Sequence, residues 1–268
     1  MFEDLFSLKG KVALVTGGGA GLGRTCTQAL LSAGARVLIC SRKADMCEAV
    51  AAELSALGPC EGFGGTVESE AGVAALAAEV RRRTDRLDIL VNNAGVTWGA
   101  DFDDFPWKGW DKVMGVNVAG LFTLTRDLMP LLLASATAES PSRVVNMGSI
   151  TGTQPIADRA YSYAASKAAV HHLTRILSHE LAARHVTVNA IAPGPFETRM
   201  TAFALGTEEG RAHAAQSIPM GRLGQAADLA GPLLFLTSRA GAYVTGSILP
   251  VDGGMSANAA DSLWLAGE

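Results

Sequence analysis

The stretch "KVALVTGGGAGLG", residues 11–23, joins an apolar run that favours β-structure to a cluster of glycines. An amphipathic pattern typical of a helix follows from about residue 24 to residue 33. A strand, a glycine turn and a helix in this order predict the first unit of a dinucleotide-binding fold. Gly17 permits the tight turn, Gly21 lets a pyrophosphate approach the backbone, and Gly23 allows close packing, while free N–H groups at the helix start hold the anion.

Apolar runs rich in Val and Ile recur along the chain and alternate with Ala-rich amphipathic stretches. These runs are "KVALV" (11–15), "RVLIC" (36–40), a weaker "EGFGGTV" (61–67), "LDILV" (87–91), "RVVNM" (143–147), "VTVNAI" (186–191) and "SILPV" (247–251). The alternation predicts an α/β fold, a doubly wound parallel (Rossmann) sheet between two layers of helices. Residues 1–268 contain no repeat or linker, so we expect a single dinucleotide-binding and catalytic domain. Residues 195–224 and 255–268 do not follow the alternation of strands and helices, and we expect a substrate loop and a C-terminal tail there, respectively.

The composition favours a soluble, cytoplasmic protein over one that binds nucleic acid or spans a membrane. Hydrophobic residues make up 49% of the 268 residues, and the net charge of −4 comes from interspersed charges. The basic run 81–83 follows an amphipathic stretch and is interpreted as the last turn of a helix. We find no signal peptide and no run of 18 apolar residues. The four cysteines lack CxxC spacing and predict core thiols, neither disulfides nor zinc ligands; they are Cys26, Cys40, Cys47 and Cys60.

Residues 161–167, "YSYAASK", place two tyrosines and a lysine in an Ala-rich stretch that favours helix. Positions four apart lie within about 40° on a helix, so Tyr163 and Lys167 share a face and Tyr161 points elsewhere. A phenol ordinarily has a pKa of about 10, and a neighbouring ammonium lowers that pKa by favouring phenolate. The pair is therefore a candidate acid–base device, and the alternative is a half-buried helix that carries both residues by chance.

Six motifs occur in the order and at the spacing of the short-chain dehydrogenase/reductase family. They are TGxxxGxG at Thr16–Gly23, "NNAG" at Asn92–Gly95, Asn117 in "MGVNVAG", Ser149 in "NMGSI", YxxxK at Tyr163–Lys167, and "PG" at Pro193–Gly194. Over about residues 8–254 the chain resembles this family. The resemblance favours the acid–base interpretation of Tyr163 and leaves Tyr161 as a pocket-wall or packing residue.

The resemblance implies catalytic roles for four residues. Tyr163 would exchange a proton with the oxygen of a ketone or alcohol, and Ser149 would donate a hydrogen bond to the same oxygen. Lys167 would lower the pKa of Tyr163 and bind the nicotinamide ribose, and Asn117 would hold a water that relays protons. No metal is implied. His172 and His179, two turns apart on one helix face, are interpreted as packing or interface residues.

The residues at the end of the second strand indicate NADP(H) in preference to NAD(H). No carboxylate is present there for a ribose 2′-hydroxyl, whereas Ser41 and Arg42 suit a 2′-phosphate. Ala20 stands where many NADP-preferring relatives carry a basic residue, and Thr66 stands where an adenine-contacting Asp is common. The expected cofactor-binding residues are Gly17, Gly19, Ala20, Gly21, Leu22, Gly23, Ser41, Arg42, Val67, Asn93, Ala94, Gly95, Tyr163, Lys167, Pro193, Gly194, Phe196 and Thr198.

Within the family, the chain is most similar to bacterial 3-oxoacyl thioester reductases, especially the rhamnolipid-pathway type. The similarity lies in "LDILVNNAG", "WDKVM", "SIPMGR" and "AGAYVTG". We therefore expect an NADP(H)-dependent carbonyl reductase of an apolar ketone, with 3-oxoacyl thioesters among the candidates. The alternatives are an NAD(P)-dependent alcohol dehydrogenase of a polyol or steroid and a dinucleotide-binding regulator without turnover, which would not need the complete Asn, Ser, Tyr and Lys set.

Apolar loop residues indicate where such a ketone would bind. The expected pocket residues are Trp98, Gln154, Phe196, Met200 and Phe203, and the 195–224 segment is expected to close over the substrate. Family analogy and apolar helices such as "LFTLTRDLMPLLLASA" (121–136) indicate a homotetramer. Docking of an acyl carrier protein is only half supported, because Arg184 matches one of two basic docking positions but Ser140 beside Glu139 occupies the other.

Overall fold

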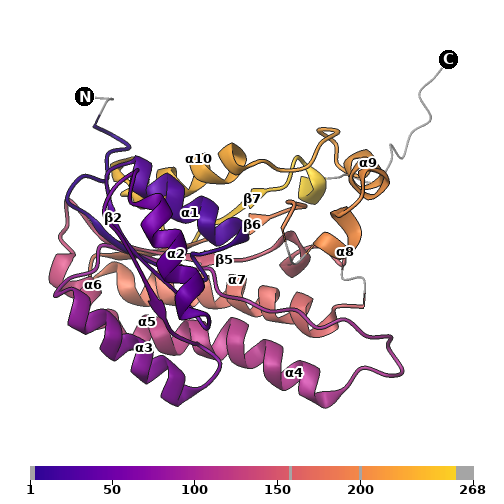
Figure 1. Cartoon of the computed structure of the whole chain (residues 1–268), viewed down its shortest axis with the longest axis horizontal. Coiled ribbons are helices and arrows are strands. Elements are labelled where there is room, and N and C mark those ends of the chain that lie inside the picture. Colours follow the sequence, from indigo (N-terminus) through magenta and orange to yellow (C-terminus); the bar gives the residue numbers. More distant parts are fainter. Residues whose placement is uncertain (1–3, 157–158, 199–200, 258–268) are drawn as a thin grey trace.

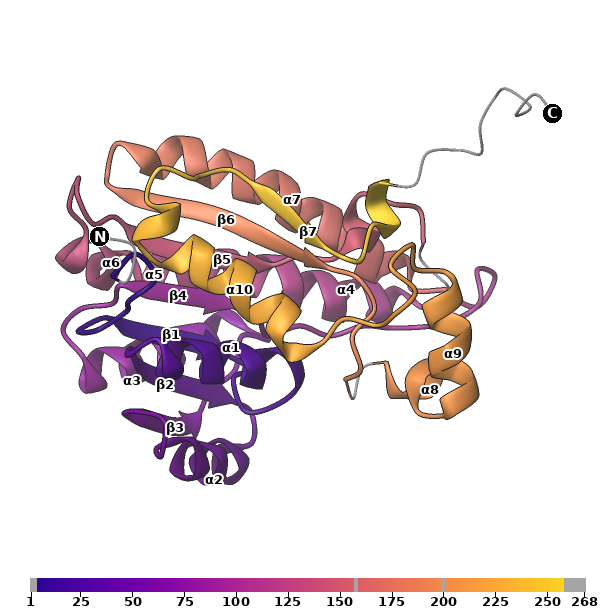
Figure 2. The same cartoon turned by 90° about the horizontal axis from the view of Figure 1, so that it is seen from above.

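Seven parallel strands form a central sheet in the order β3-β2-β1-β4-β5-β6-β7 (Figure 2). The computed structural model describes residues 4–156, 159–198 and 201–257, without the side chains of residues 203 and 204. The strands are β1 Val12–Thr16, β2 Arg36–Ser41, β3 Cys60–Gly64, β4 Ile89–Asn92, β5 Ser142–Met147, β6 Val186–Pro193 and β7 Ile248–Val251. The predicted doubly wound α/β fold is confirmed, and the weakly predicted third strand exists.

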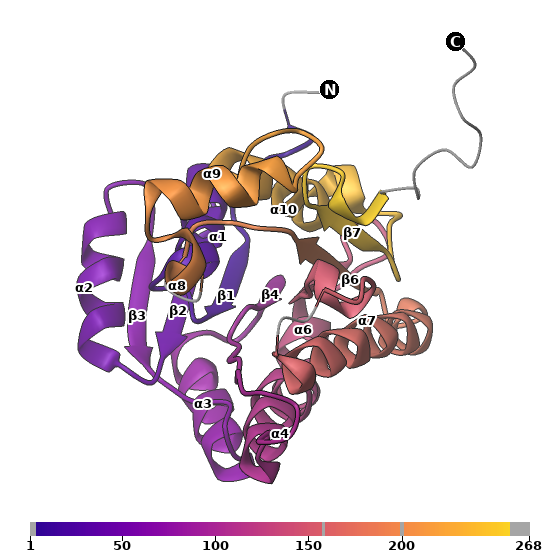
Figure 3. The same ribbon diagram turned by 90° about the vertical axis from the view of Figure 1, so that its right-hand side faces the viewer.

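Helices connect the strands and cover both faces of the sheet (Figures 1 and 3). The α-helices are α1 Gly21–Ser32, α2 Ala44–Leu54, α3 Glu70–Arg83, α4 Trp107–Met114, α5 Leu121–Asp127, α6 Met129–Ser135, α7 Tyr161–Ala182, α8 Ala202–Leu205, α9 Glu208–Gln216 and α10 Ala226–Thr237. A π-helical segment, η1 Gly115–Gly120, joins α4 to α5, and the short 3₁₀ helices are η2 Ile150–Gly152, η3 Arg239–Gly241 and η4 Met255–Ala257.

Alternating side chains of the buried strands build two cores. In β1, Ala13 and Val15 pack with residues of α1, α2 and α10, whereas Leu14 packs with residues of α3, α5, α6 and α7. Strands covered on both faces need apolar residues at successive positions, which is why the predicted strands are continuous apolar runs. Both helix layers therefore hold the sheet rigid beneath its carboxyl edge.

The apolar segment 121–136 is two helices, and the expectation of one long helix there is wrong. Helix α5 ends at Asp127 and α6 begins at Met129, with Pro130 in the first turn of α6. Pro130 has no backbone N–H to donate to the carbonyl oxygen four residues earlier, and its ring crowds that carbonyl, so the helix breaks before Pro130 and a new helix starts with proline in its first turn.

The segment 195–224 contains α8 and α9, which lie beside the carboxyl edge of the sheet (Figure 3). An isolated parallel bridge pairs Phe196 with Gly224 and closes the base of this excursion. Met200, the side chain of Phe203 and most of the predicted 255–268 tail lie outside the described residues.

The four cysteines carry free thiols; Cys26, Cys40 and Cys47 are buried, as expected for core thiols, whereas Cys60 is only half-buried. The arginines at 81–83 form the last turn of α3, which confirms that interpretation. Among the described residues, no single helix has the length and hydropathy needed to cross a membrane, although the bent pair Trp107–Asp127 and Met129–Ser135, which meet at 52°, qualifies by length and composition alone.

Candidate active site

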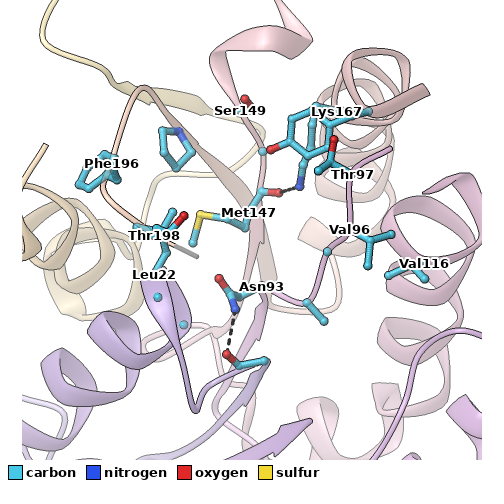
Figure 4. A pocket seen from close by; sticks show the side chains of 18 of the residues that line it. Leu22, Asn93, Val96, Thr97, Val116, Met147, Ser149, Lys167, Phe196 and Thr198 are labelled. Carbon is cyan, nitrogen blue, oxygen red and sulfur yellow. Dashed lines mark hydrogen bonds between the residues drawn. The ribbon is translucent and has the colours of Figure 1, made fainter. Parts of the chain in front are cut away.

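A cavity of about 660 Å³ lies at the carboxyl edge of the sheet, and Figure 4 shows part of its lining. Its walls come from the β1–α1 turn, from the residues that follow β2, β3, β4, β5 and β6, and from α7, α8 and α9. Strand order reverses between β1 and β4, and in open α/β sheets ligands bind at such a switch point.

The glycine turn after β1 forms one end of the cavity. Gly17 and Gly21 adopt φ angles of +68° and +49°, and a Cβ on Gly23 would lie 2.2 Å from the carbonyl oxygen of Gly17. Helix α1 begins without a side-chain cap at Ala20 and without an acidic residue in its first turn. Its first N–H groups therefore remain available for an anion. The turn thus has the geometry that the sequence predicts for a pyrophosphate-binding loop.

Asn93 holds the turn against the end of β4. Its side-chain amide donates to the carbonyl oxygen of Thr16 at 2.8 Å, and the Thr16 hydroxyl accepts from the backbone N–H groups of Asn93 and Ala94. Figure 4 shows the Asn93 side chain turned toward the turn, and this bond is drawn there. The glycine turn and the "NNAG" motif after β4 are thus joined by hydrogen bonds into one structural unit.

The ends of β2 and β3 lie side by side and contribute a paired set of charges. Arg42 follows β2, and its Nη1 atom donates to Oε1 of Glu68 at 2.6 Å, both side chains lining the cavity. Ser41 accepts from the backbone N–H of Lys43 and from the thiol of Cys47. Arg42 is therefore available to a 2′-phosphate only in competition with Glu68.

Ser149, Tyr163 and Lys167 line the opposite part of the cavity. Helix α7 carries Tyr163 and Lys167 on one face, and the Lys167 Nζ atom lies 5.5 Å from the centre of the phenol ring. Nζ also donates to the carbonyl oxygen of Met147 at 2.6 Å, a bond drawn in Figure 4. Ser149 follows β5 in an extended backbone conformation.

Burial governs the protonation of these groups. It lowers the pKa of Lys167 to about 8, because the ammonium loses hydration. It raises the pKa of Tyr163 above its ordinary value, while a hydrogen bond with Ser149 acts in the opposite direction. The expected lowering of the Tyr163 pKa by Lys167 is thus not seen in this structure, where desolvation of the phenolate outweighs the hydrogen bond with Ser149.

Asn117 is buried in the π-helical segment η1, beneath the cavity. Its Nδ2 atom donates to the Val96 carbonyl oxygen and to the Ser166 hydroxyl, and its Oδ1 accepts from the Val96 N–H. Isolated π-helical turns are frequent at functional sites. Asn117 is not among the residues that line the cavity, and its amide fixes the loop after β4 against α7.

Seventeen of the predicted cofactor residues line the cavity: Gly17, Ala20, Gly21, Leu22, Gly23, Ser41, Arg42, Val67, Asn93, Ala94, Gly95, Tyr163, Lys167, Pro193, Gly194, Phe196 and Thr198. Gly19 does not, and the side chains nearest to its Cβ position are those of Met46 and Cys47 on α2. The cavity also brings in Thr66, at the position noted for adenine.

The predicted substrate residues are only partly brought together. Phe196 lines the cavity, but Trp98 and Gln154 do not. The Trp98 ring packs beneath Lys108 and Lys112, and the Gln154 amide donates to the Ser256 carbonyl oxygen. The apolar side chains that line the cavity near α7 and the 195–224 segment instead include Ile156, Leu205 and Met255.

Helix α7 presents its remaining predicted residues away from the cavity. Tyr161 packs edge-on against the rings of Phe102 and Phe105, as expected for a packing residue. His172 and His179 are both exposed. Among the described residues, no three His, Cys, Asp or Glu side chains are grouped so that they could hold a metal ion.

Two residues beside Ser149 were missed by sequence reasoning. The hydroxyl of Thr151 donates to the Ser149 Oγ atom at 3.0 Å, and Nε2 of buried His171 accepts from the Ser149 N–H at 3.5 Å. The position of Thr151, two residues after Ser149, was the only available signal. His171 is separated from Ser149 by 22 residues, and only the fold brings them together.

Comparison with known proteins agrees with this geometry, and the chain belongs to the short-chain dehydrogenase/reductase family. The profile of the family described as Enoyl-(Acyl carrier protein) reductase matches residues 17–256.

Individual relatives include the rhamnolipids biosynthesis 3-oxoacyl-[acyl-carrier-protein] reductase of Pseudomonas aeruginosa. It is 47% identical over 249 residues, which cover 93% of this chain and 97% of the relative. A galactitol 2-dehydrogenase (L-tagatose-forming) of Cereibacter sphaeroides is 39% identical, covering 94% of this chain and 98% of the relative. The solved Pseudomonas aeruginosa RhlG/NADP active-site complex superposes with a TM-score of 0.92 at 46% identity and covers 94% of this chain and 99% of that one.

Proposed function

We propose that this protein is an NADP(H)-dependent oxidoreductase that interconverts a ketone and a secondary alcohol. The observation that carries the proposal is the meeting of Ser149, Tyr163 and Lys167 in the same cavity as the glycine turn and Arg42. A protein that only senses a dinucleotide would not need a half-buried phenol together with a buried hydroxyl and a buried ammonium at this place.

Each polar group has a definite task in the proposed reaction. Tyr163 gives its proton to the carbonyl oxygen during reduction and takes it back during oxidation. Ser149 donates a hydrogen bond to that oxygen and stabilises the negative charge that develops there. Lys167 keeps one N–H on the Met147 carbonyl, so its remaining N–H groups can reach the nicotinamide ribose and the phenol. The cofactor, when bound, supplies or accepts the hydride.

We propose that Asn117 acts as the anchor of the proton relay. Its amide fixes Val96 and Ser166, which flank Lys167 from two elements, and the relay water would lie between this segment and the Lys167 Nζ atom. Because both N–H groups of the amide are already donated, such a water would use the second lone pair of Asn117 Oδ1 or backbone groups of η1.

We propose an apolar ketone, and specifically a 3-oxoacyl thioester, as the substrate class. Among the described lining residues, only Arg42, Glu68 and Lys167 carry charged side chains, and the first two lie at the ends of β2 and β3. Among the residues that the structure describes, Lys167 is the one cation that lines the catalytic end of the cavity and could pair with a sugar acid. The apolar residues Ile156, Phe196 and Leu205 there suit an acyl chain.

A substrate panel tests the proposal. Purified enzyme is given NADPH and 3-oxoacyl thioesters of increasing chain length, an apolar cyclic ketone and a keto sugar acid, and loss of reduced cofactor is followed optically. We expect kcat/KM to rise with acyl length and to be lowest for the sugar acid. A sugar acid as the best substrate would overturn the substrate class, and no turnover of any ketone would overturn the enzymatic proposal.

The 195–224 segment is proposed to close over the substrate. Its described residues Thr198, Thr201, Leu205 and Ala214 line the cavity from one side. Closure by α8 and α9 would exclude water during hydride transfer. Replacing Leu205 by Ala is then expected to change the ranking of acyl lengths in the panel, and an unchanged ranking would contradict the role.

Only one of the two basic positions expected for docking of an acyl carrier protein is present in this chain. Arg184 is exposed beyond α7, but Ser140, at the second docking position, accepts a hydrogen bond from the Lys11 Nζ atom at 2.9 Å. We therefore expect coenzyme A thioesters and carrier-protein thioesters of equal chain length to give similar kcat/KM values.

A cytoplasmic homotetramer is proposed as the working form. The exposed side chains of Trp110, Phe122 and Ile176 lie on α4, α5 and α7, and an exposed Tyr243 precedes β7. Symmetric packing would bury such apolar groups. Buried free thiols suit a reducing compartment. Light scattering is expected to give four times the chain mass of 27.7 kDa, and a monomer across micromolar concentrations would contradict the assembly.

A further inference from the structure

The hydroxyl of Ser149 is surrounded by donors that belong to Thr151. The backbone N–H of Thr151 donates to the Ser149 Oγ atom at 3.2 Å, and the Thr151 hydroxyl donates to the same atom at 3.0 Å. Thr151 is half-buried in the 3₁₀ turn η2 and lines the cavity beside Ser149. One residue thus contacts the reacting serine twice.

A serine hydroxyl has one proton to donate and two lone pairs that accept. Both lone pairs of Ser149 are taken by Thr151, so the only capacity left to Ser149 is donation of its own proton. Ser149 then cannot accept a hydrogen bond from Tyr163. In this structure a hydrogen bond joins Ser149 to Tyr163, and Ser149 can only be its donor. When a ketone is bound, the protons of both residues are then free to point to the substrate oxygen.

We propose that Thr151 is a positioning residue that locks Ser149 as a hydrogen-bond donor toward the substrate oxygen. Without the Thr151 hydroxyl, one lone pair of Ser149 becomes free and can accept the phenolic proton of Tyr163. That alternative bond withdraws the Tyr163 proton from the reaction and points the Ser149 proton elsewhere. The inference rests on the proposed ketone–alcohol chemistry and assigns it one more residue.

Thr151→Val is the direct test, because valine keeps the shape of threonine and removes only the hydroxyl. A neutral hydrogen bond contributes roughly 1 kcal/mol, so we expect kcat for ketone reduction to fall about three- to tenfold. KM for the ketone and Kd for NADPH are expected to stay within about twofold. Thr151→Ser restores the hydroxyl and is expected to recover most of kcat.

Thr153→Val is the matched control. Thr153 follows the same turn, and its hydroxyl donates to the Ile150 carbonyl oxygen at 3.1 Å and not to Ser149. We expect this variant to keep the wild-type kcat. If Thr151→Val does not fold, Thr151→Ala, which also lacks the hydroxyl, is compared with Thr151→Ser in its place.

The pH profile of alcohol oxidation separates positioning from a merely structural effect. Donation from Ser149 to the phenolate lowers the pKa of Tyr163, so loss of the lock should raise the apparent pKa for oxidation in Thr151→Val. Two titratable groups of α7 lie beside this pair in the described structure, and the substitution alters neither: the Lys167 Nζ atom lies over the Tyr163 ring, and His171 accepts from the Ser149 N–H.

Three results would overturn the positioning role: an unchanged kcat in Thr151→Val, equal losses in Thr151→Val and Thr151→Ser, or a slower rate with an unshifted pH profile. Failure of the proposed function is distinguishable, because the wild-type enzyme would then reduce no ketone in the panel at all.

Discussion

Replacing Arg42 by alanine is expected to weaken NADPH binding about tenfold and to leave NADH binding within about twofold. Arg42 lines the cavity where β2 ends, at the place of the adenosine ribose in a doubly wound sheet. A guanidinium pairs with a 2′-phosphate through charge-assisted bonds, whereas NADH presents only a neutral hydroxyl there.

The magnitude follows from the partner that Arg42 already has. Charge-assisted hydrogen bonds contribute roughly 1.5–3 kcal/mol. The Arg42–Glu68 pair, with side chains 60% and 37% exposed, is worth only about 0.2–1 kcal/mol and is given up when the guanidinium turns to the phosphate. A net preference of about 1–2 kcal/mol remains, which corresponds to roughly five- to thirtyfold.

Calorimetric titration of both cofactors into wild type, Arg42→Ala and Glu68→Gln measures the contributions of Arg42 and Glu68 to the binding free energy. Glu68→Gln removes the competitor and is expected to tighten NADPH binding by up to about fivefold. Arg24→Ala is the matched control, because Arg24 pairs with Glu53 outside the cavity lining. Wild-type protein that binds NADH as tightly as NADPH, or an Arg42→Ala variant that loses both equally, would refute the reasoning.

Three further predictions concern packing and protonation. Gly23→Ala is expected to abolish binding of both cofactors and to lower the melting temperature, because its Cβ would lie 2.2 Å from the Gly17 carbonyl oxygen; unchanged affinity in a titration would contradict the close packing. Burial, together with Lys167 and Arg175, lowers the pKa of His171 from its ordinary 6.5 to about 4. As the pH falls, His171 is therefore protonated in the unfolded chain before it is protonated in the folded chain. Stability should therefore fall as the pH falls from about 6.5 to 4, by up to about 3 kcal/mol, and the fall should be shallower in His171→Gln; parallel unfolding curves would exclude His171 as the cause. A thiol reagent at mildly alkaline pH should modify Cys60 first, because Cys60 is only half-buried whereas Cys26, Cys40 and Cys47 are buried; burial raises the pKa of Cys60 to about 11 and that of Cys26 and Cys40 to about 12, so labelling should be slow throughout, and early labelling of Cys26 by mass spectrometry would contradict its burial.

Local chemistry made much of the fold and site predictable from the sequence. The glycine turn, the apolar strands and the shared face of Tyr163 and Lys167 depend on residues close in sequence, and the structure has all three. The end of α5 was predictable in principle from Pro130 but was overridden by the apolar pattern of residues 121–136.

Contacts between distant segments were not predictable in the same way. Glu68 reaches Arg42 because β2 and β3 are paired in a particular register, with Ser41 opposite Gly64. The pKa of Tyr163 depends on how deeply the phenol is buried, which no spacing in "YSYAASK" reveals. Trp98 suited a pocket wall by type and position, yet it packs under the side chains of α4.

Turnover by Tyr163→Phe tests the assigned chemistry most directly. The substitution removes one hydroxyl from a half-buried ring, and general acid catalysis is typically worth a factor of about 10²–10⁴. We predict that kcat for ketone reduction falls at least about a hundredfold while NADPH binds within about twofold of wild type, and that Tyr161→Phe, whose ring packs on Phe102 and Phe105, stays near wild type. Turnover by Tyr163→Phe within about tenfold of wild type would contradict the assignment of Tyr163 as the proton donor.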